Sequence, residues 1–304
     1  MIKSRRPVRP SMAAAALAAA ALLACGLAGC GQGGKSAGTT GQRAQPSGPG
    51  SGRQAQHAAG RFSQPVIVSN PMFPLVVGTQ FVYTGRLVDG EGTKSHSVVF
   101  TVTDLTKQVD HVRTVVALDQ DFRQGELQEQ ELAFFAQDDA GNVWNFGEYP
   151  EEYDNGKFTG APSTWIRGTA GAYGGIHMLA HPKAGAQYRE GLVPAIEFDD
   201  VSRVARTGQT TCEQARCYQR VLVIDETSPN DPTSGHQIKY YAPHTGLVRV
   251  GARGGDTQEF LTLGAVRHLD EAAMAKARAE ALAMDRRAYH VSEVYRVTPT
   301  ARAG

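Results

Sequence analysis

The sequence predicts a mainly β fold: a single antiparallel, curved sheet or an open barrel or sandwich, with a C-terminal helix. From residue 62 onward, short runs rich in Val, Thr, Tyr and Phe alternate with turn residues at close spacing, which is typical of antiparallel strands joined by hairpins. No helical segments separate these runs, so the pattern does not fit a parallel sheet. One alanine-rich helical stretch, residues 269–288, follows the last run.

The predicted strands differ in how clearly they alternate. Residues 79–87 place Phe81, Tyr83 and Leu87 on one face, as a half-buried strand requires. The other candidate strands are 97–103, 112–118, 127–137, 143–146, 201–206, 218–224, 237–241, 246–250 and 258–266. Residues 155–194 contain many Gly, Pro and Ala and few alternations, so we expect a long excursion with a turn or short helix over one face of the sheet.

The predicted helix has charges that suit its dipole. Asp270 and Glu271 stand at its start, and Arg286 and Arg287 at its end, where they oppose the partial charges of the helix ends. Its apolar face is mostly Ala and Met, which predicts weak packing. The tail from Val291 is expected to be loose.

The first thirty residues resemble a bacterial lipoprotein signal. Four cations precede an apolar run of Ala and Leu, which ends in Leu27-Ala28-Gly29-Cys30. These are the parts of a secretory signal, and the last four residues resemble a lipobox, in which the cysteine thiol receives a diacylglycerol and the chain is cut just before it. Two acyl chains suffice for stable anchoring. The alternative is an ordinary signal peptide cut near Ala28, which would leave a free thiol at Cys30.

The predicted organisation therefore has four parts. Residues 1–29 form the signal peptide, and 30–60 a lipidated cysteine with a disordered tether rich in Gly, Ser and Gln. Residues 61–268 form the β-rich domain, and 269–304 the helix and loose tail. Removal of four cations leaves a mature charge of (31 − 4) − 30 = −3, which argues against a nucleic-acid partner. We expect an extracytoplasmic protein anchored by lipid to a membrane of the cell envelope.

Two cysteines lie in the β-rich part. Cys212 and Cys217 are expected to form a disulfide, because an exported protein meets an oxidising compartment. A metal site would need further ligands, and a redox pair would have the spacing Cys-x-x-Cys.

An acidic cluster is one candidate metal site. It comprises Glu148, Glu151, Glu152 and Asp154, and carboxylates of this kind bind calcium. The competing interpretation is a plain hairpin, because residues 154–157 read Asp-Asn-Gly-Lys.

A histidine pair is the second candidate. His177 and His181 are four residues apart, a spacing that on a helix would serve zinc. Pro182 would end such a helix, and the glutamate of metalloprotease motifs is absent. Two histidines on a surface loop are the simpler interpretation. No cofactor is predicted beyond calcium or zinc at these residues.

Three segments carry a resemblance to a family. Residues 70–83 read Asn-Pro-Met-Phe-Pro-Leu and then, from Gly78, Gly-Thr-Gln-Phe-Val-Tyr; residues 135–148 and 240–248, the latter Tyr-Tyr-Ala-Pro-His-Thr-Gly-Leu-Val, continue the pattern. The chain resembles a family of uncharacterised secreted bacterial proteins over 70–250. The resemblance implies a β-rich fold and no particular activity.

The sequence leaves three functional classes open. The first is a non-catalytic binding domain for an apolar ligand, a lipid or an envelope protein, favoured because no serine-hydrolase elbow or phosphate loop is present and no catalytic residue can be named. The second is a metal-dependent hydrolase that uses the acidic cluster with a histidine. The third is a structural surface protein. The aromatic residues of the strands would line a cavity in the first class and fill a core in the third.

Overall fold

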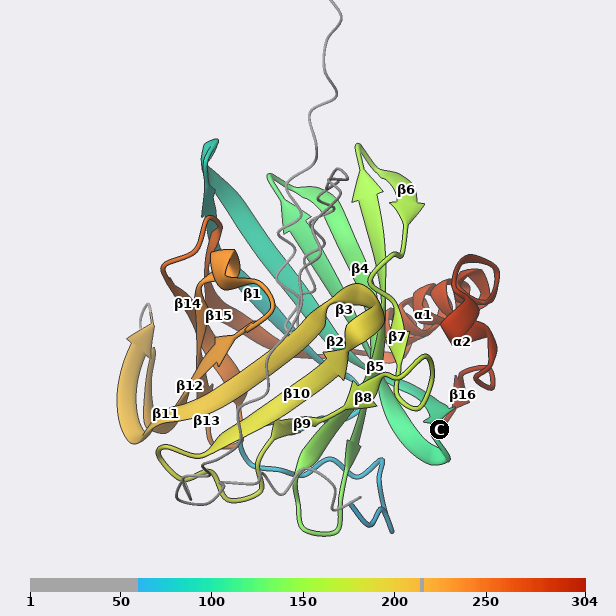
Figure 1. The fold of residues 1–304 in the computed structure, drawn as a ribbon, viewed down its shortest axis with the longest axis horizontal. Helices are drawn as coiled ribbons and strands as arrows, with labels where there is room; N and C mark the ends of the chain where they lie inside the picture. Colours follow the sequence, from blue (N-terminus) through green and yellow to red (C-terminus); the bar gives the residue numbers. More distant parts are fainter. Residues whose placement is uncertain (1–59, 214–215) are drawn as a thin grey trace, which may run out of the picture.

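The computed structural model describes residues 60–213 and 216–304. The predicted signal peptide, Cys30 and all but the last residue of the tether lie outside them. The described chain forms one antiparallel sheet with a helix on one side (Figure 1). The mainly β prediction is confirmed.

Two meanders make up the sheet. The first contains β1 Thr79–Asp89, β2 Gly92–Val109, β3 Val112–Arg123, β4 Glu126–Gln137, β5 Val143–Asp154 and β6 Lys157–Gly160. The second contains β10 Gln187–Val193, β11 Phe198–Glu213, β12 Arg216–Thr227, β13 His236–Ala242, β14 Gly246–Arg253 and β15 Gln258–His268. The remaining elements are β7 Trp165–Ile166, β8 Tyr173–Gly174, β9 Ile176–Met178, η1 Pro194–Ile196, η2 Pro232–Ser234, α1 Glu271–Val291, α2 Glu293–Arg296 and β16 Arg302–Ala303.

The two meanders join through β1 and β15, which are far apart in sequence. Strand β1 pairs with β2 on one side and with β15 on the other. The order across the sheet is β6-β5-β4-β3-β2-β1-β15-β14-β13-β12-β11-β10-β8, and this path does not close on itself. Its centre is therefore built from the first and the last of the long strands.

The predicted excursion crosses from one end of the sheet to the other. It contains no α-helix; β8 pairs with β10, and β9 pairs with β5. At Gly175 the backbone N–H donates to the carbonyl of Glu190, and the carbonyl accepts from the N–H of Asn145, both at 2.9 Å. A Cβ at Gly175 would lie 2.0 Å from the Arg189 carbonyl oxygen, so the close approach of these strands requires glycine.

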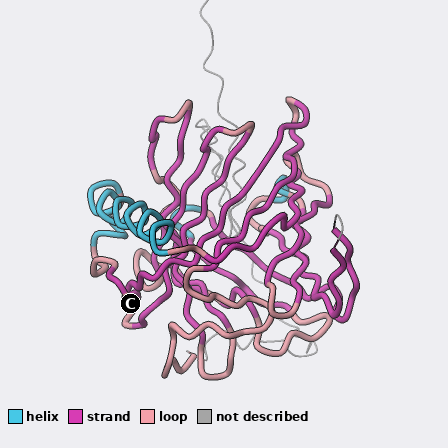
Figure 2. Tube along the Cα trace, turned by 180° about the vertical axis from the view of Figure 1, so that it is seen from behind, coloured by secondary structure: helices cyan, strands magenta, loops and turns pink. Residues whose placement is uncertain are grey.

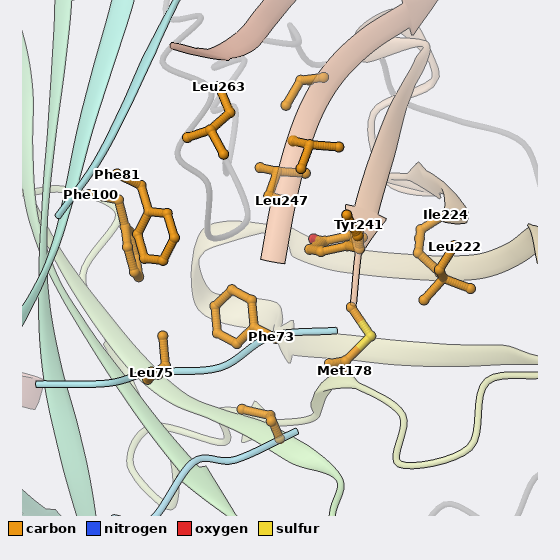
Figure 3. Packing of buried hydrophobic residues seen from close by; sticks show 14 of the residues in the cluster. Phe73, Leu75, Phe81, Phe100, Met178, Leu222, Ile224, Tyr241, Leu247 and Leu263 are labelled. Atoms are coloured by element: carbon orange, nitrogen blue, oxygen red, sulfur yellow. The ribbon is translucent and has the colours of Figure 1, made fainter. Parts of the chain in front are cut away.

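The inner face of the sheet encloses an apolar core. Side chains from both meanders meet there, so the sheet is folded over on itself. Figure 3 shows Phe73 between the rings of Phe81 and Phe100 on one side and Tyr241 on the other. The Phe73 ring lies 5.3 Å from that of Phe135 and 4.4 Å from that of His177, centroid to centroid. The inward positions of β1 predicted at Phe81, Tyr83 and Leu87 are all buried.

Helix α1 covers the outer face of the first meander (Figure 2). Small side chains, Ala281 and Ala288, let it approach, and Met284 fills the space between them. Asp270 caps its first turn by accepting from the N–H of Ala273. Among the described residues no helix is long and apolar enough to cross a membrane.

The C-terminal tail is packed, contrary to the expectation that it is loose. Tyr295 is fully buried, its ring 5.2 Å from that of Tyr149. Its hydroxyl donates to the Asp285 carboxylate at 2.6 Å. Strand β16 then pairs with β2. The tail is held because one large aromatic side chain fills the space beside α1.

The three segments that carry the family resemblance meet at one end of the apolar core. The Asn70 side chain donates to the carbonyls of Gly141 and Leu179 at 2.9 and 3.1 Å. The N–H of His244 donates to the carbonyl of Pro71 at 2.6 Å. These contacts hold Phe73 over the core, so packing and turn geometry account for the residues at these positions.

Candidate functional site

The inner face changes from apolar to polar along several of the long strands. On β3 the inward positions run from Ala117 to Asp119 and Asp121, and on β15 from Leu261 to Glu259. Because the strands are antiparallel and the registers fixed, the polar positions of β2, β3, β4 and β15 lie toward the end of the sheet where β1 turns into β2 and β3 into β4, at the top of Figure 1, whereas His177 on β9 lies beside the start of β5. We call this set the polar layer. It comprises the buried residues His96, Asp119, Asp121, Glu131, Glu148, His177, Glu190, Asp200, Ser202, Glu226, Lys239 and Glu259.

Negative charge dominates the polar layer. Its buried members include eight carboxyls, but only one lysine and two histidines. Burying a charge is expensive unless it is paired and hydrogen-bonded. A cluster of buried ionisable groups with perturbed pKa values is therefore a candidate functional site.

One part of the layer is organised around a lysine. The ammonium of Lys239 donates to both oxygens of Glu226, at 2.9 and 2.8 Å. Burial alone would lower the pKa of Lys239, but the carboxylates of Glu226 and Glu190 outweigh it and raise that pKa. The lysine is therefore a fixed cation within the fold.

A second carboxylate near this lysine is paired with a histidine. Glu190 Oε2 lies 2.9 Å from His177 Nδ1, and Glu190 Oε1 accepts from the hydroxyl of Ser202. Burial opposes ionisation of Glu190, yet the charges of His177 and Lys239 bring its pKa down to about 2. Burial and the neighbouring carboxylates raise the pKa of Glu226. Together these groups form a compact ionic network.

Glu131 on β4 and Glu148 on β5, the members of the polar layer from these strands, have no such cation beside them. Glu148 accepts from the indole N–H of Trp165 at 2.9 Å and from the amide of Asn145 at 2.5 Å, and burial still raises its pKa to about 8. Glu131 is 1% exposed, and its Oε1 has no hydrogen-bond partner. Burial and the proximity of Glu148 raise the pKa of Glu131 well above its usual range. These two groups favour the protonated form in the folded protein.

Three further members converge on one point. His96 Nε2 lies 3.0 Å from Glu259 Oε1 and 3.3 Å from Asp121 Oδ2. Burial lowers the pKa of His96, but the two carboxylates outweigh it and the net shift is upward. Burial raises the pKa of Asp121 to about 7. All three side chains are at most 6% exposed.

The predicted acidic cluster does not form one site. Glu148 points into the polar layer, whereas Glu151 lies on the outer face, where Arg287 donates to both of its oxygens at 2.8 and 2.6 Å. Glu152 is half-buried near the end of β5, and Asp154 is exposed beside the turn into β6. Glu148 and Glu151 are three positions apart on one strand, so their side chains point to opposite faces. The turn at 154–157 closes the hairpin that its sequence indicates.

The two predicted histidines also separate. His177 is buried in the polar layer, and His181 is exposed on the following loop. They lie on a short strand and a bend, so the helical spacing does not apply. Of the predicted residues, the structure therefore brings Glu148 and His177 into the polar layer and leaves the others outside it.

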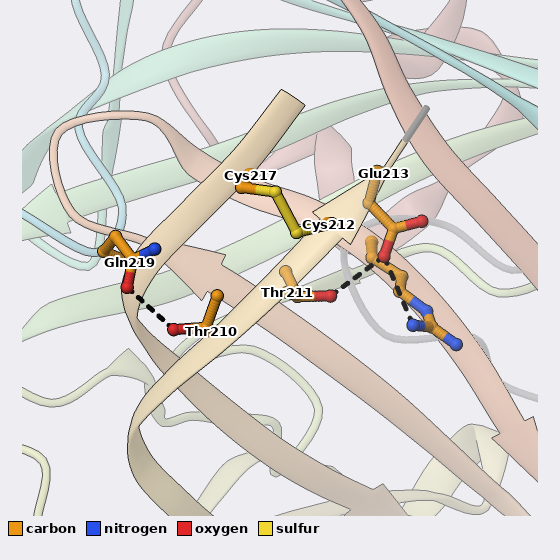
Figure 4. The surroundings of a disulfide bond; sticks show 7 residues. Thr210, Thr211, Cys212, Glu213, Cys217 and Gln219 are labelled. Atoms are coloured by element: carbon orange, nitrogen blue, oxygen red, sulfur yellow. Dashed lines mark hydrogen bonds and ion pairs between the residues drawn. A yellow bond between two sulfur atoms is a disulfide. The ribbon is translucent and has the colours of Figure 1, made fainter. Parts of the chain in front are cut away.

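The predicted disulfide is confirmed. Cys212 and Cys217 face each other directly in the register of β11 and β12 and form the bond (Figure 4). Around it, Thr210 donates to Gln219 at 2.7 Å, and Glu213 pairs with Arg249 at 3.2 Å. The disulfide holds the end of this hairpin and lies outside the polar layer.

Comparison with known proteins gives little further guidance. No described protein family matches the chain, and no curated protein shows significant similarity to it. Two solved structures are similar: one from Bacteroides fragilis, described as an exported protein with a YmcC-like fold, and one from Parabacteroides distasonis, described as a lipoprotein. Both are 14% identical; they cover 64% and 65% of this chain and 98% and 99% of their own, with TM-scores of 0.37 and 0.30. Similarity at this level supports no conclusion about function, and the family resemblance noted in the sequence stays a prediction.

Proposed function

We propose that this chain is an exported lipoprotein of a bacterial cell envelope, held at a membrane by lipid on Cys30. The basic start, the apolar run and the Leu-Ala-Gly-Cys segment support the anchor. The described residues begin at Gly60, so 29 residues lie between them and Cys30. In this proposal the domain is a binding module outside the cytoplasm.

The binding site in this proposal is the polar layer, and its ligand carries ammonium or other donor groups. The observation that supports it is the excess of buried carboxyls, with unpartnered atoms such as Glu131 Oε1. An unpartnered buried acceptor costs about 1–3 kcal/mol, which a ligand with donor groups would offset. Since cations favour the ionised form of carboxyl groups, a cationic ligand would also draw protons from the layer.

An apolar ligand fits the inner face less well. The aromatic side chains there pack against one another, and the cavity among Phe73, Phe81, Phe100 and Tyr241 measures only about 20 Å³. That is roughly the space for one water molecule. The aromatic residues therefore act as core, which favours a polar ligand over a lipid chain.

The anchor is tested by replacing the cysteine. Cells that express the wild-type protein or Cys30→Ala are fed a labelled fatty acid, and membrane and extracytoplasmic soluble fractions are separated. We expect label and membrane location for the wild type, and neither for the variant. An unlabelled wild-type protein would contradict the anchor.

The ligand class is tested with two probes. Full-length protein is titrated with a polyamine and, separately, with a fatty acid, and binding is measured by calorimetry and native mass spectrometry. We expect the polyamine to bind and Glu131→Gln to weaken its binding at least about tenfold, which is the loss of one charge-assisted contact. The control is Glu151→Gln, a buried carboxylate on the outer face, which should bind as the wild type does. Fatty-acid binding without polyamine binding would contradict the polar site.

A further inference from the structure

We infer that His96, Asp121 and Glu259 form a binding site for one divalent metal ion of the zinc class. The site is part of the polar layer but does not depend on the ligand proposed above. One atom of each residue, the His96 Nε2 and a carboxylate oxygen of the other two, lies within 4.8 Å of the rest. The three residues come from β2, β3 and β15, so the register of the sheet assembles the site.

A glycine brings two of these residues into reach of each other. Strand β1 lies between β2 and β15, and there Gly85 stands opposite both His96 and Leu261. From its place opposite Gly85, the imidazole of His96 reaches across β1 to Glu259 on β15. A Cβ at Gly85 would lie 1.8 Å from the Phe260 carbonyl oxygen, so the backbone here tolerates no other residue.

The distances match those between ligands of one metal ion. Atoms bound about 2.0–2.2 Å from zinc lie roughly 3–3.5 Å from one another. His96 Nε2 is 3.0 Å from Glu259 Oε1 and 3.3 Å from Asp121 Oδ2. The imidazole nitrogen is thus spaced from each carboxylate oxygen as neighbouring ligands are, and the two carboxylate oxygens lie within 4.8 Å of each other.

Hydrogen bonding leaves these same atoms unsatisfied. His96 Nε2, Asp121 Oδ2 and Glu259 Oε1 are all buried, and none makes a contact with the direction of a hydrogen bond. One N–H cannot point at two carboxylates at once, whereas a metal ion accepts a lone pair from all three atoms. Unpartnered buried groups that converge in this way are suited to sharing one cation.

The charges and the surrounding contacts also suit a divalent ion. Two carboxylates and a neutral imidazole carry a charge of −2. The Arg123 guanidinium, opposite His96 in the register of β2 and β3, adds one positive charge nearby, so the surroundings of the site stay negative. The Gln237 amide donates to Glu259 Oε2 at 2.8 Å and leaves Oε1 for the metal. Such hydrogen bonds commonly orient the ligands of a metal ion. One nitrogen and two oxygen ligands suit zinc, and three protein ligands leave positions for water.

The His177 cluster provides the contrast within the same layer. Glu190 there has His177 at 2.9 Å and Ser202 on its other oxygen, and Lys239 supplies a fixed cation to the network. A metal ion would compete with that lysine. His177→Gln is therefore the matched control for His96→Gln.

Zinc binding to the full-length protein tests the site. The protein is stripped with chelator and titrated with zinc by calorimetry, and metal content is checked by plasma mass spectrometry. We expect one zinc per chain with a micromolar or tighter Kd. Loss of a hydrogen bond to a metal ligand typically weakens metal binding 10–100-fold, so Gln237→Leu should weaken zinc binding by a factor in that range. His96→Gln and Glu259→Gln each remove a ligand and should weaken zinc binding at least about 100-fold. His177→Gln and Glu131→Gln should bind zinc as the wild type does.

X-ray absorption of the zinc-loaded wild type gives a second readout if a variant does not fold. One imidazole nitrogen with the remaining ligands oxygen is the expected coordination. A wild type that binds no zinc, unchanged binding in folded His96→Gln, or coordination by sulfur or by two imidazoles would each overturn the site. Because Glu131→Gln should affect the polyamine alone, failure of the polar-ligand proposal would leave the zinc result intact.

Discussion

The two faces of the sheet hold buried charge in different ways. On the outer face, beneath α1, opposite charges meet in pairs: Lys107 with Asp285 at 2.9 Å, and Arg287 with Glu151 at 2.6 Å. Tyrosine hydroxyls complete these pairs, with Tyr295 on Asp285 and Tyr149 on Glu151. On the inner face the carboxyls of the polar layer outnumber the cations.

The difference separates two uses of a buried charge. A pair whose hydrogen bonds are complete attaches one element to another, and removing either member leaves an uncompensated charge. A layer with excess carboxyls and unpartnered atoms is costly as it stands, and that cost is explained if a ligand or ion completes it. We therefore infer that the ion pairs of the outer face stabilise the fold, and we place the proposed binding site on the inner face.

The largest loss of stability is expected from breaking an ion pair on the outer face of the sheet. Lys107→Met removes the ammonium from Asp285 and from the carbonyl of Pro299, to which it donates at 2.7 Å. We expect the free energy of unfolding to fall by about 3–5 kcal/mol, measured by urea denaturation followed by tryptophan fluorescence.

A control for this prediction lies on α1, the helix that carries Asp285. Arg278 pairs with Asp104, and both side chains are partly exposed, so Arg278→Ala should leave the urea midpoint nearly unchanged. If Lys107→Met were as mild as Arg278→Ala, the outer pairs would not attach the helix and the comparison between the faces would fail.

A smaller change in the free energy of unfolding, an increase instead of a decrease, is expected from a substitution on the inner face. The pKa of Glu131 is raised from 4.5, chiefly by burial, so the folded protein keeps a proton that the unfolded chain releases as the pH rises. Wild-type stability therefore decreases with rising pH above about 4.5 until the raised pKa is passed. Gln at this position cannot ionise. We expect Glu131→Gln to stabilise the fold by about 1–3 kcal/mol near pH 9 and to change it little near pH 4.

Urea denaturation at both pH values checks this prediction, and Glu151→Gln supplies the comparison. Glu151 has Arg287 and two tyrosine hydroxyls as partners, so losing its charge should destabilise the fold near pH 9, the opposite sign to Glu131→Gln. A Glu131→Gln variant whose effect does not depend on pH would show that folding does not raise the pKa of Glu131, and would remove it from the argument for an unsatisfied layer.

Much of the fold could be predicted from the sequence because alternation is a local signal. Phe81, Tyr83 and Leu87 share a face as expected, and the turn at 154–157 closes a hairpin. The packed tail could not be predicted, because a single Tyr295 carries its burial and its contacts come from distant strands. The family motif at 70–75 was visible, but its role in closing the core depends on contacts with 141 and 244.

The polar layer could not be predicted either, because it also depends on contacts between distant strands. Each strand that contributes supplies only one or two residues, and the layer exists only once the register is known. A partial signal was present: Asp119 and Asp121, like Glu131 and Glu129, occupy alternate positions that continue the inward face of Ala117 and Ala133. Charged residues at inward positions of a strand could have marked that end of the sheet. The convergence of His96 with Glu259 could not be foreseen, because it requires β1 to lie between their strands.

The pairing of β1 with β15 has a consequence for how the chain acquires its structure. Thr79 pairs with His268, so the middle of the sheet joins residues that are separated by most of the domain. Contacts of such long range make folding slow, because a large loop must close before they form. A chain threaded through a membrane from its N-terminus would expose the unpaired edge of β1 until β15 has emerged. Export in an unfolded state is thus compatible with this topology, and the interval before β15 arrives is when the chain is most open to proteases and to pairing with other exposed strands.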